Sequence, residues 1–537
     1  MRKTPRIAAA LAVSLVAALA VTACANKRDE SGDDTKDKEA QSKAQQVLED
    51  AGVSTPVTLN LQYNPDHYGD ISDQEYALIK EQLEATGLFK VNLQSTEWVT
   101  YNQQRISDYP VYQLGWYPDF PDADNYLTPF FDKENFLHNG FDDANIQGLL
   151  AEERVELDEA TRVAQLENLQ AELAKQLSTI PLLQGSQVAV TGLDMEGVET
   201  TMDASFQFRF ATFVKGGDPA AKIKVGTTDE VTGLDPAGTY DNGSFLVQTN
   251  VFPMVLSFKQ GNPVPTPDLA ESCDFSEDGL KFICKIKPNL KWANGNTLDA
   301  NDIKFTYDRQ KGINDPNGPS SLLTNLESVT VPDPLTVEFN LGSPNDVTFA
   351  QVLASPVGPV VDDEVFLADE LTPANVIVEA NSFAGPYTIT TFSVNELIEY
   401  APNPSYDSVQ GKAANGGVLM SYYKESTNMR LDIEAGEIDV VWRTLPPTDI
   451  SQLEQADGVK VLHGPGGEIR YIVWNLETMP GDSDAQKLAI RQAVAYSLNR
   501  TELADQVYQG TYTPLCSYVP DGVPGATESV CDLYGGK

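Results

Sequence analysis

The length of the chain is the feature that most restricts its fold. A single hydrophobic core does not extend over 537 residues, so the chain is expected to form two or more lobes. Its composition, 41% hydrophobic and 9% aromatic, is typical of a globular protein. A short amphipathic helix over 44–52 precedes a strand over 57–63, and a second helix over 75–87 precedes a strand over 90–98. This alternation predicts an α/β architecture.

Later segments extend the pattern in two blocks. Apolar residues at three- and four-residue steps predict a long helical region over 145–177. The glycine-containing stretch over 214–219 is interpreted as a linker, and a new strand begins at Lys222. The second block is rich in strands and holds two further helical segments, over 428–441 and 485–510.

The charge of the chain excludes two classes of partner. Lys and Arg total 37 against 78 Asp and Glu, which gives a formal net charge of -41. Such a surface repels nucleic acid and anionic lipid, so we set both aside as partners.

Residues 1–23 have the features of a secretion signal. A basic start is followed by an apolar run over 7–20 that is too short for a standard membrane span. The run ends in VTAC, which resembles the bacterial lipobox, whose cysteine (here Cys24) is lipidated. A simple secretory peptide with an incidental cysteine is the alternative. Residues 24–36 are polar and charged without an apolar period, so we expect a flexible tether there.

Four cysteines follow the signal, an even number in an oxidising compartment. Cys273 and Cys284 flank a turn between two apolar-alternating arms, which predicts a hairpin with a disulfide across it. Cys516 and Cys531 flank a loop rich in proline and glycine and are expected to pair. Zinc is the weaker interpretation, because neither pair has CxxC spacing and no histidine is near in sequence.

The segment QLGWYPDFPDADNYLTPFF over 113–131 gathers acidic and aromatic residues, and its three prolines disfavour a regular helix or strand. Such a loop could bind a metal, hydrolyse a sugar with paired carboxylates, or hold a cationic ligand group among rings. An acidic surface loop is the plain alternative. Asp122 and Asp124 supply only two steps of a calcium loop, without its glycine and glutamate, so we interpret them as turn and cap residues.

The sequence offers little support for catalysis. The three histidines His67, His138 and His463 have no metal-ligand spacing, and neither a G-x-S-x-G elbow nor a Walker-type loop occurs. A glycosidase needs only two carboxylates without sequence proximity, so that class stays open.

Several separated segments carry a family resemblance. The longest is DGLKFICKIKPNLKWANGNTLDANDIKFTYDR over 278–309, and LDIEAGEIDVV, IRQAVAYSLNRTELADQVYQGTYTP and GWYPDFPDADNYL agree with it. Together they resemble the bacterial extracellular solute-binding proteins of family 5, which are the peptide-, dipeptide- and nickel-binding receptors of ABC importers. The resemblance implies an α/β, type II periplasmic-binding-protein fold with two lobes, a hinge cleft between them and an extra subdomain.

The order of the segments departs from that family. There, the block that begins IKVGTT comes first and the block that holds GWYPDFPDADNYL comes last, whereas here residues 37–215 precede residues 216–537. The chain therefore looks circularly permuted, which a fold tolerates where the original ends lie close together. The implied division is lobe two over 37–185 and 496–537, and lobe one with the extra subdomain over 186–495.

The resemblance also implies a ligand site. In the peptide-binding members, the segment matching GWYPDFPDADNY carries the aspartate that neutralises the ligand's α-ammonium, and the matching position here is Asp119. Trp116 and Tyr117 would shape the cleft beside it, loop packing being their alternative role. From the opposing side, Asn242, Gly243 and Asn475 match positions that face the cleft and would meet peptide amides.

One departure concerns the ligand's carboxylate. Dipeptide-specific members carry an arginine for it in a region that matches LQYNPDHYGD, where His67 is the only possible cation. This favours longer peptides. An oligosaccharide is the second choice of ligand, since the five tryptophans would allow sugar stacking: Trp98, Trp116, Trp292, Trp442 and Trp474.

The expected function is a receptor without catalytic activity, metal or cofactor, which captures oligopeptides and delivers them to the permease of an ABC transporter. A lipid on Cys24 would anchor it, as a monomer, on the extracytoplasmic face of the cell membrane, and this anchor would be its only membrane contact. An oligosaccharide receptor is the alternative, and a secreted glycosidase is the third hypothesis.

Overall fold

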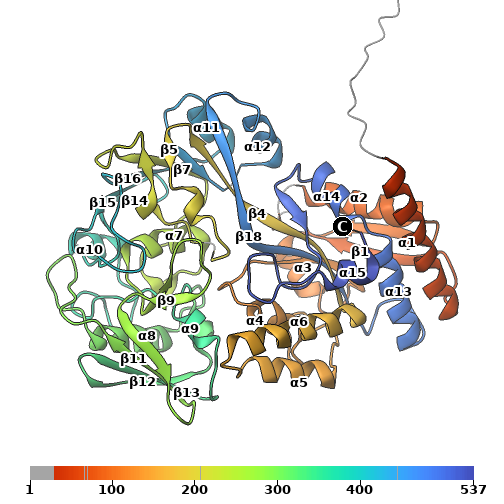
Figure 1. The fold of residues 1–537 in the computed structure, drawn as a ribbon, viewed down its shortest axis with the longest axis horizontal. Helices are drawn as coiled ribbons and strands as arrows, with labels where there is room; N and C mark the ends of the chain where they lie inside the picture. The colour runs from red at the N-terminus through yellow and green to blue at the C-terminus, as the bar shows by residue number, and fades with distance from the viewer. Residues whose placement is uncertain (1–29, 66, 69–70, 206, 444, 537) are drawn as a thin grey trace, which may run out of the picture.

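Two long strands, β4 (Thr179–Gly192) and β18 (Val459–Trp474), pair antiparallel and run from one lobe of the molecule into the other (Figure 1). The computed structural model describes residues 30–65, 67–68, 71–205, 207–443 and 445–536. The red, orange and dark blue segments of Figure 1, from the two ends of the chain, form one lobe, and the middle of the chain forms the other. The two-lobed α/β fold expected from the sequence is confirmed.

Both lobes share one sheet of eleven strands, in the order β14-β15-β16-β7-β17-β4-β18-β3-β1-β2, with β19 paired to β4. The crossing strands therefore divide the sheet into a part in each lobe. The other strands of this sheet are β1 (Val57–Tyr63), β2 (Phe89–Ser95), β3 (Val111–Trp116), β7 (Ile223–Thr227), β14 (Tyr387–Ser393), β15 (Leu397–Pro402), β16 (Val418–Tyr422), β17 (Val440–Trp442) and β19 (Tyr512–Pro514).

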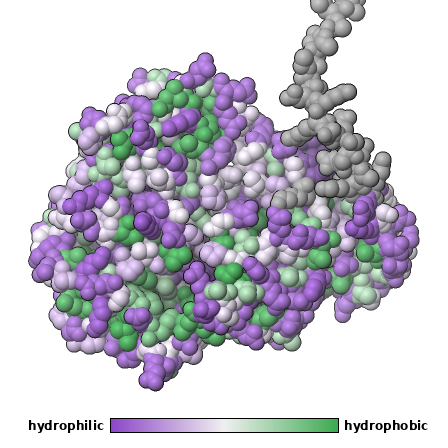
Figure 2. Space-filling model, in the orientation of Figure 1, coloured by the Kyte–Doolittle hydropathy of each residue, from purple (hydrophilic) through white to green (hydrophobic). Residues whose placement is uncertain are grey.

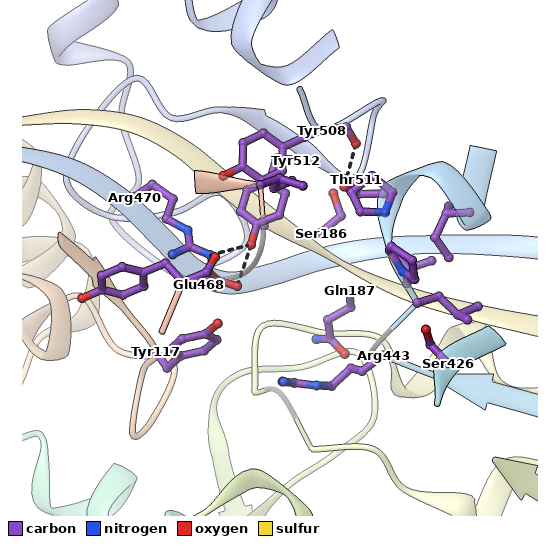
Figure 3. A pocket seen from close by; sticks show the side chains of 18 of the residues that line it. Tyr117, Ser186, Gln187, Ser426, Arg443, Glu468, Arg470, Tyr508, Thr511 and Tyr512 are labelled. Carbon is purple, nitrogen blue, oxygen red and sulfur yellow. Dashed lines mark hydrogen bonds and ion pairs between the residues drawn. The ribbon is translucent and has the colours of Figure 1, made fainter. Parts of the chain in front are cut away.

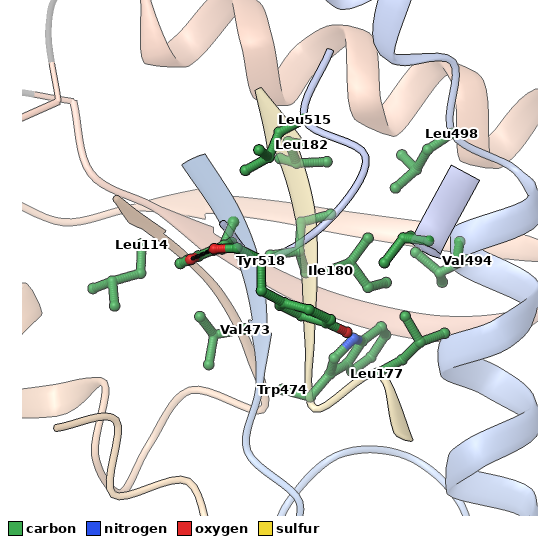
Figure 4. Packing of buried hydrophobic residues seen from close by; sticks show 14 of the residues in the cluster. Leu114, Leu177, Ile180, Leu182, Val473, Trp474, Val494, Leu498, Leu515 and Tyr518 are labelled. Carbon is green, nitrogen blue, oxygen red and sulfur yellow. Dashed lines mark hydrogen bonds between the residues drawn. The ribbon is translucent and has the colours of Figure 1, made fainter. Parts of the chain in front are cut away.

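The core of lobe two joins segments that are far apart in the sequence. It takes buried residues from between Ala44 and Leu183 and again from between Ile469 and Tyr534. Figure 4 shows the result: Leu114, Ile180, Trp474 and Tyr518 come from four separate segments and pack together. Its helices are α1 (Glu30–Asp50), α2 (Ser72–Ala85), α3 (Trp98–Gln104), α4 (Asp124–Phe131), α5 (Ala144–Glu153), α6 (Glu159–Gln176), α13 (Asp484–Tyr496), α14 (Arg500–Gln506) and α15 (Ser529–Tyr534).

Lobe one has its own core, built from residues between Ala189 and Trp442 together with Phe120, and a small additional cluster around Val441 and Ile450. A separate sheet in the order β10-β11-β13-β12 is the extra subdomain expected in this lobe. Its strands are β10 (Ala270–Phe275), β11 (Lys281–Ile286), β12 (Leu326–Asp333) and β13 (Thr336–Leu341). The helices of lobe one are α7 (Asn242–Val251), α8 (Ala300–Ile313), α9 (Phe349–Val352), α10 (Ala374–Glu379), α11 (Ser426–Glu434) and α12 (Pro447–Leu453). Two short pairs complete the strands: β5 (Met195–Glu196) with β6 (Val214–Lys215), and β8 (Leu256–Phe258) with β9 (Pro265–Pro267).

Two predicted helical segments are each divided in the structure. The region over 145–177 forms α5 and α6, because the Asp158 carboxylate accepts a hydrogen bond from the Thr161 amide and starts a new helix. The segment over 485–510 forms α13 and α14, with Asn499 as the corresponding cap. Neither break contains proline or glycine, the residues from which the end of a helix was predicted.

Two expected boundaries were wrong. Helix α1 begins at Glu30, so the tether expected over 24–36 is helical from that residue on, and its first part lies outside the described residues. No glycine or proline interrupts residues 33–51, and Lys43 pairs with Glu39 one turn away at 3.0 Å. Residues 469–495 pack in the core of lobe two, not in lobe one as expected, because β18 enters lobe two at Ile469 and α13 packs on α1.

Hydrophilic side chains cover most of the face in Figure 2, with smaller apolar patches between them. Among the helices of the described residues, none is both long enough and apolar enough to span a bilayer.

Both predicted disulfides are present. Cys273 and Cys284 lie directly opposite each other on β10 and β11, and the hairpin between them is confirmed. Cys516 bonds to Cys531 on α15, close to the end of the chain.

Replacing both Cys516 and Cys531 by alanine should lower the free energy of unfolding by about 2–4 kcal/mol, since the bond restricts a loop of the unfolded chain. Urea denaturation followed by circular dichroism measures the change. Dithiothreitol should lower the free energy of unfolding of the parent towards that of the variant. In the variant it should act only through the remaining Cys273–Cys284 bond. An unchanged midpoint in the double variant would contradict the stabilising role.

Candidate functional site

A cavity of about 530 Å³ lies where β4 and β18 cross from lobe to lobe (Figure 3). Lobe two contributes Tyr68, Tyr117, Tyr508 and Tyr512 to its wall. Lobe one contributes Ser426, Val441, Arg443 and Ile450, and the crossing strands contribute Gly185, Gln187, Glu468 and Arg470. Its volume is in the range of small-molecule binding sites, and interfaces between domains are a frequent place for them.

Glycines let the backbone close the wall of the cavity. A Cβ atom on Gly466 would lie 2.0 Å from the carbonyl oxygen of Gly185, and one on Gly467 would lie 2.5 Å from the Pro118 ring. The Tyr126 hydroxyl donates a hydrogen bond of 2.9 Å to the Gly467 carbonyl. The loop that carries Tyr117 and Asp119 is thus held directly against the crossing strand.

One ion pair lies on the crossing strand itself. Glu468 and Arg470 are two residues apart, so their side chains share a face of β18, and Arg470 Nη2 lies 2.5 Å from Glu468 Oε1. Tyr512 donates a hydrogen bond of 2.9 Å to the same carboxylate. The guanidinium carbon of Arg470 also lies 4.8 Å from the ring centre of Tyr68, and this contact holds the arginine in place.

A second ion pair comes from lobe one. Arg443 follows strand β17, and its Nε atom lies 3.2 Å from Asp229 Oδ2. With Glu468 and Arg470, the cavity region therefore holds two positive and two negative side chains. Such a lining matches a ligand that carries both charges better than a ligand of one sign.

A buried acid lies behind the cavity. Glu75 on α2 is 0% exposed and accepts a hydrogen bond of 2.9 Å from Tyr508, which lines the cavity. Burial raises the pKa of Glu75 to about 7; the charge of Glu468 adds to this shift, while Arg470 and Tyr508 oppose it. Within the described residues, its Oε1 atom has no hydrogen-bond partner.

Because folding raises the pKa of Glu75, the stability that it contributes is present below its ordinary value of 4.5 and is lost as the pH rises through 7. Glu75→Gln should therefore raise the free energy of unfolding at pH 8 by about 3 kcal/mol, and by less than about 1 kcal/mol at pH 5. Urea denaturation at several pH values measures both. The matched control is Glu81→Gln, an exposed position on the same helix, which should leave the pH dependence of the parent unchanged. A gain from Glu75→Gln that does not depend on pH would contradict the assignment.

The structure places Asp119 at a contact between the lobes. Its Oδ1 atom accepts a hydrogen bond from the hydroxyl of Tyr240 in lobe one, and its Oδ2 atom accepts one of 3.0 Å from Asn125. Asn125 also accepts from the Asp119 amide at 2.9 Å and from the Trp116 indole at 3.2 Å. Burial raises the pKa of Asp119, and the bonds from Asn125 and Tyr240 oppose that shift. A buried carboxylate in this position gains from a cationic partner.

The structure brings only some of the expected residues together. Tyr117 lines the cavity, whereas Trp116 is half-buried with its ring edge-on to Phe130, 5.1 Å between ring centres. Asn242 is exposed at the start of α7, and Gly243 is buried where a Cβ atom would lie 2.0 Å from the Glu230 carbonyl oxygen. The residue of this segment that reaches Asp119 is Tyr240, which the sequence analysis missed although it lies two positions before Asn242.

Asn475 lies away from the cavity, at the far end of β18. Its side chain donates to the Ile106 carbonyl at 3.2 Å and accepts from the amides of Glu477 and Thr478 at 3.1 Å each. Among the described residues that line the cavity, Asn475 does not occur. Its contacts are those of a residue that shapes the turn after a strand.

Asp122 and Asp124 act inside lobe two. Asp122 accepts from the Asp124 amide at 2.9 Å, as expected of a turn residue, and it also holds Arg162 through two hydrogen bonds of 2.7 and 2.8 Å. It is 6% exposed, so the alternative of an acidic surface loop does not describe this position.

The aromatic residues of the site are tyrosines and not the tryptophans named above. Trp292, Trp442 and Trp474 are at most 1% exposed, within the hydrophobic cores of the two lobes. Trp98 stacks on His67 with 3.8 Å between ring centres, and His67 itself lines the cavity. These positions therefore do not supply the tryptophan rings on which a sugar was expected to stack.

The described residues bring three carboxylates together in lobe one: Asp302, Asp362 and Asp363. Asp302 accepts a hydrogen bond of 3.1 Å from the Trp292 indole, and Asp362 accepts from Asn294 and Asn296 at 2.8 and 3.0 Å. These bonds join α8 and the segment around Asp362 to the segment of residues 292–296, so we assign no metal to the group.

A cavity between two lobes, with side chains from both in its wall, is typical of solute-binding proteins. The chain matches the family model described as "Bacterial extracellular solute-binding proteins, family 5 Middle" over residues 17–137 and 264–533, more than half of its length. It therefore belongs to the bacterial extracellular solute-binding proteins of family 5, and its fold is the two-lobed type II periplasmic-binding-protein fold. This is a family of binding proteins and not of enzymes.

Individual relatives are distant. The chain is 24% identical over 312 residues to the probable D,D-dipeptide-binding periplasmic protein DdpA of Escherichia coli K12. This match covers 57% of this chain and 58% of that protein. It is 24% identical over 380 residues to the dipeptide-binding protein of the same organism, covering 65% of each. The oligopeptide-binding protein AppA of Bacillus subtilis, solved with a nonapeptide, is similar with a TM-score of 0.38 and 20% identity, over 44% of this chain and 46% of that one. The chain thus spans less than two thirds of the length of these relatives.

Proposed function

We propose that the protein captures peptides in the cavity between its lobes and delivers them to the permease of an ABC transporter. The observation that carries this proposal is the position of Asp119, a half-buried carboxylate at the contact between the lobes and two residues after Tyr117, which lines the cavity. A peptide presents an α-ammonium group that would neutralise such a carboxylate when the lobes close around it. The dipeptide-binding relatives agree with this chemistry.

The surroundings of Asp119 suit an ammonium group in a second respect. Asn125 fixes the carboxylate through its side-chain amide, and Pro118 packs against Gly467 of the crossing strand. A preorganised carboxylate costs little ordering on binding. The ammonium of the ligand would take the position of the Tyr240 hydroxyl or share the carboxylate with it.

Asp119→Asn should lower the affinity for a peptide with a free α-amine, such as tri-alanine, by about 30-fold or more, because it removes the charge and keeps the size of the side chain. N-acetyl tri-alanine should bind the parent about as weakly as tri-alanine binds the variant. Isothermal titration calorimetry measures these affinities. Asp407→Asn is the matched control, because Asp407 is an exposed acid of lobe one with a side chain that is 76% exposed. Equal binding of free and acetylated peptide by the parent would show that Asp119 is not the ammonium site.

We propose further that a lipid on Cys24 anchors the receptor outside the cytoplasmic membrane, although Cys24 lies outside the described residues. The support is the VTAC sequence after a short apolar run. Cys24→Ser should move the protein from the membrane pellet to the soluble fraction of the host cells or to the medium, as measured by fractionation and immunoblotting. Retention of the variant in the pellet after a wash in mild salt would contradict the anchor.

The segment order supports a related proposal, that the chain is a circular permutation of the family order. The two ends of the described chain lie together: residues 39–43 and 531–536 line one cavity of about 610 Å³, and Figure 1 shows the C-terminus beside α1. The Gly536 carbonyl also accepts a hydrogen bond of 2.9 Å from the Arg500 amide, which fixes this end on lobe two. A fold with adjacent ends can be opened elsewhere without loss of its cores. In this order the anchored segment enters lobe two through α1.

A further inference from the structure

Arg443 has an unusual backbone conformation beside the cavity. Its φ angle is +62°, in the left-handed region that residues other than Gly and Asn rarely adopt. Six of the nine such non-glycine residues in the described part of the chain are Asn or His. Arg443 is neither, and it follows a strand and not the end of a helix. Backbone strain of this kind persists where the surroundings enforce it, and it is concentrated at ligand sites.

The strained conformation delivers a cation to the cavity. Figure 3 shows the Arg443 guanidinium reaching in on the side where Tyr117 and Gln187 lie. Its side chain is 19% exposed, whereas that of Arg470 in the same cavity is 3% exposed. Burial lowers the pKa of Arg443, but the nearby Asp229, Tyr117 and Glu468 raise it overall, so the side chain stays charged. Arg443 is therefore the more accessible of the two arginines in the cavity.

The pair with Asp229 is compatible with a second carboxylate. A guanidinium has five N–H donors on separate edges and can hold two carboxylates at once. Arg162 does this in the same protein, with Nη2 2.7 Å from Asp122 and 2.9 Å from Glu153. In the Arg443 pair it is Nε that contacts Asp229. Ligand binding would give Arg443 the arrangement that Arg162 already has.

We propose that Arg443 binds a carboxylate of the ligand, so that this receptor selects peptides that present an acidic group to the lobe-one side of the cavity. The inference rests on the proposed function and names the chemistry of its ligand more closely. Arg443 comes from a segment distant from LQYNPDHYGD, where the sequence offered His67 as the only possible cation. The carboxylate is either the C-terminus of a short peptide or an acidic side chain, and the two sources can be separated.

Two pairs of peptides separate them. Tri-alanine and tri-alanine amide differ only in the C-terminal carboxylate, while Ala-Glu-Ala amide and Ala-Gln-Ala amide differ only in the side-chain carboxylate. Isothermal titration calorimetry on the parent and its variants gives the preference for the acidic member of each pair. We expect the parent to prefer the acidic member of one pair by about 30-fold or more, and that pair identifies the source.

Arg443→Gly is the decisive variant, because glycine suits the positive φ angle and removes the guanidinium without disturbing the turn. It should reduce the preference to within about threefold. Arg443→Lys should retain part of the preference, since it keeps the charge and loses the two-pronged geometry. The matched control is Arg430→Gln, which removes an arginine of lobe one that is 22% exposed and paired to Asp449 and Glu434, and which should leave the preference unchanged.

The outcomes separate the two proposals. If Arg443→Gly keeps the preference of the parent, or if the parent binds acidic and amide peptides alike, the inference is overturned and the proposed function stands. If the parent binds none of the four peptides, the proposed function fails and the inference fails with it.

Discussion

The antiparallel pairing of β4 with β18 is the constraint on which the rest of the structure depends. Each strand contributes at one end to the core of lobe two and at the other end to lobe one, with Ile180 and Ala189 as examples on β4. The chain segments on either side must therefore return to the same two cores, whatever their order in the sequence. This is the physical reason why a permuted segment order is compatible with the fold: a core is defined by which faces pack, not by which segment comes first.

The same crossing also sets the chemistry of the site. Where the strands leave one core and have not yet entered the other, their side chains face a cavity. Val188 and Val190 of β4 are apolar, and the charged or polar side chains there are Gln187, Glu468 and Arg470. A charge removed from water needs a partner, and each charge in the cavity has one: Glu468 with Arg470, and Asp229 with Arg443. Asp119 is not among the residues that line the cavity, and it accepts hydrogen bonds from the neutral groups of Tyr240 and Asn125. Under the proposed function, a cationic ligand would give this carboxylate the charged partner that Glu468 already has.

The sequence predicted those features that local patterns determine. Strands, the α/β alternation and both disulfides follow from periodicity and spacing, and the structure confirms them. The breaks at Asp158 and Asn499 were not predicted, because a side-chain cap can start a new helix where no residue disfavours the helical conformation. Asp119 was proposed from its motif and stays a prediction as a ligand residue, whereas Tyr240 and Arg443 belong to no motif. Their positions beside Asp119 and the cavity arise from which loops the two cores bring together, and Glu75 becomes unusual only through burial beneath Tyr508.

The contacts between the lobes affect how a ligand can act. In this structure Tyr240 of lobe one bonds to Asp119 of lobe two, and the Val347 amide of lobe one donates to the Arg154 carbonyl at 3.2 Å. This arrangement of the lobes therefore has favourable contacts of its own, and a ligand would favour it only by binding it more tightly than an arrangement without them. The bond from Tyr240 already has a carboxylate as its acceptor, and an ammonium would add a charged donor, which turns the contact into an ion pair. A ligand without that charge would have to give up the Tyr240 contact for nothing better. Under the proposed function, the contact between Tyr240 and Asp119 would therefore also disfavour uncharged solutes, because they would displace an existing hydrogen bond without supplying a charge.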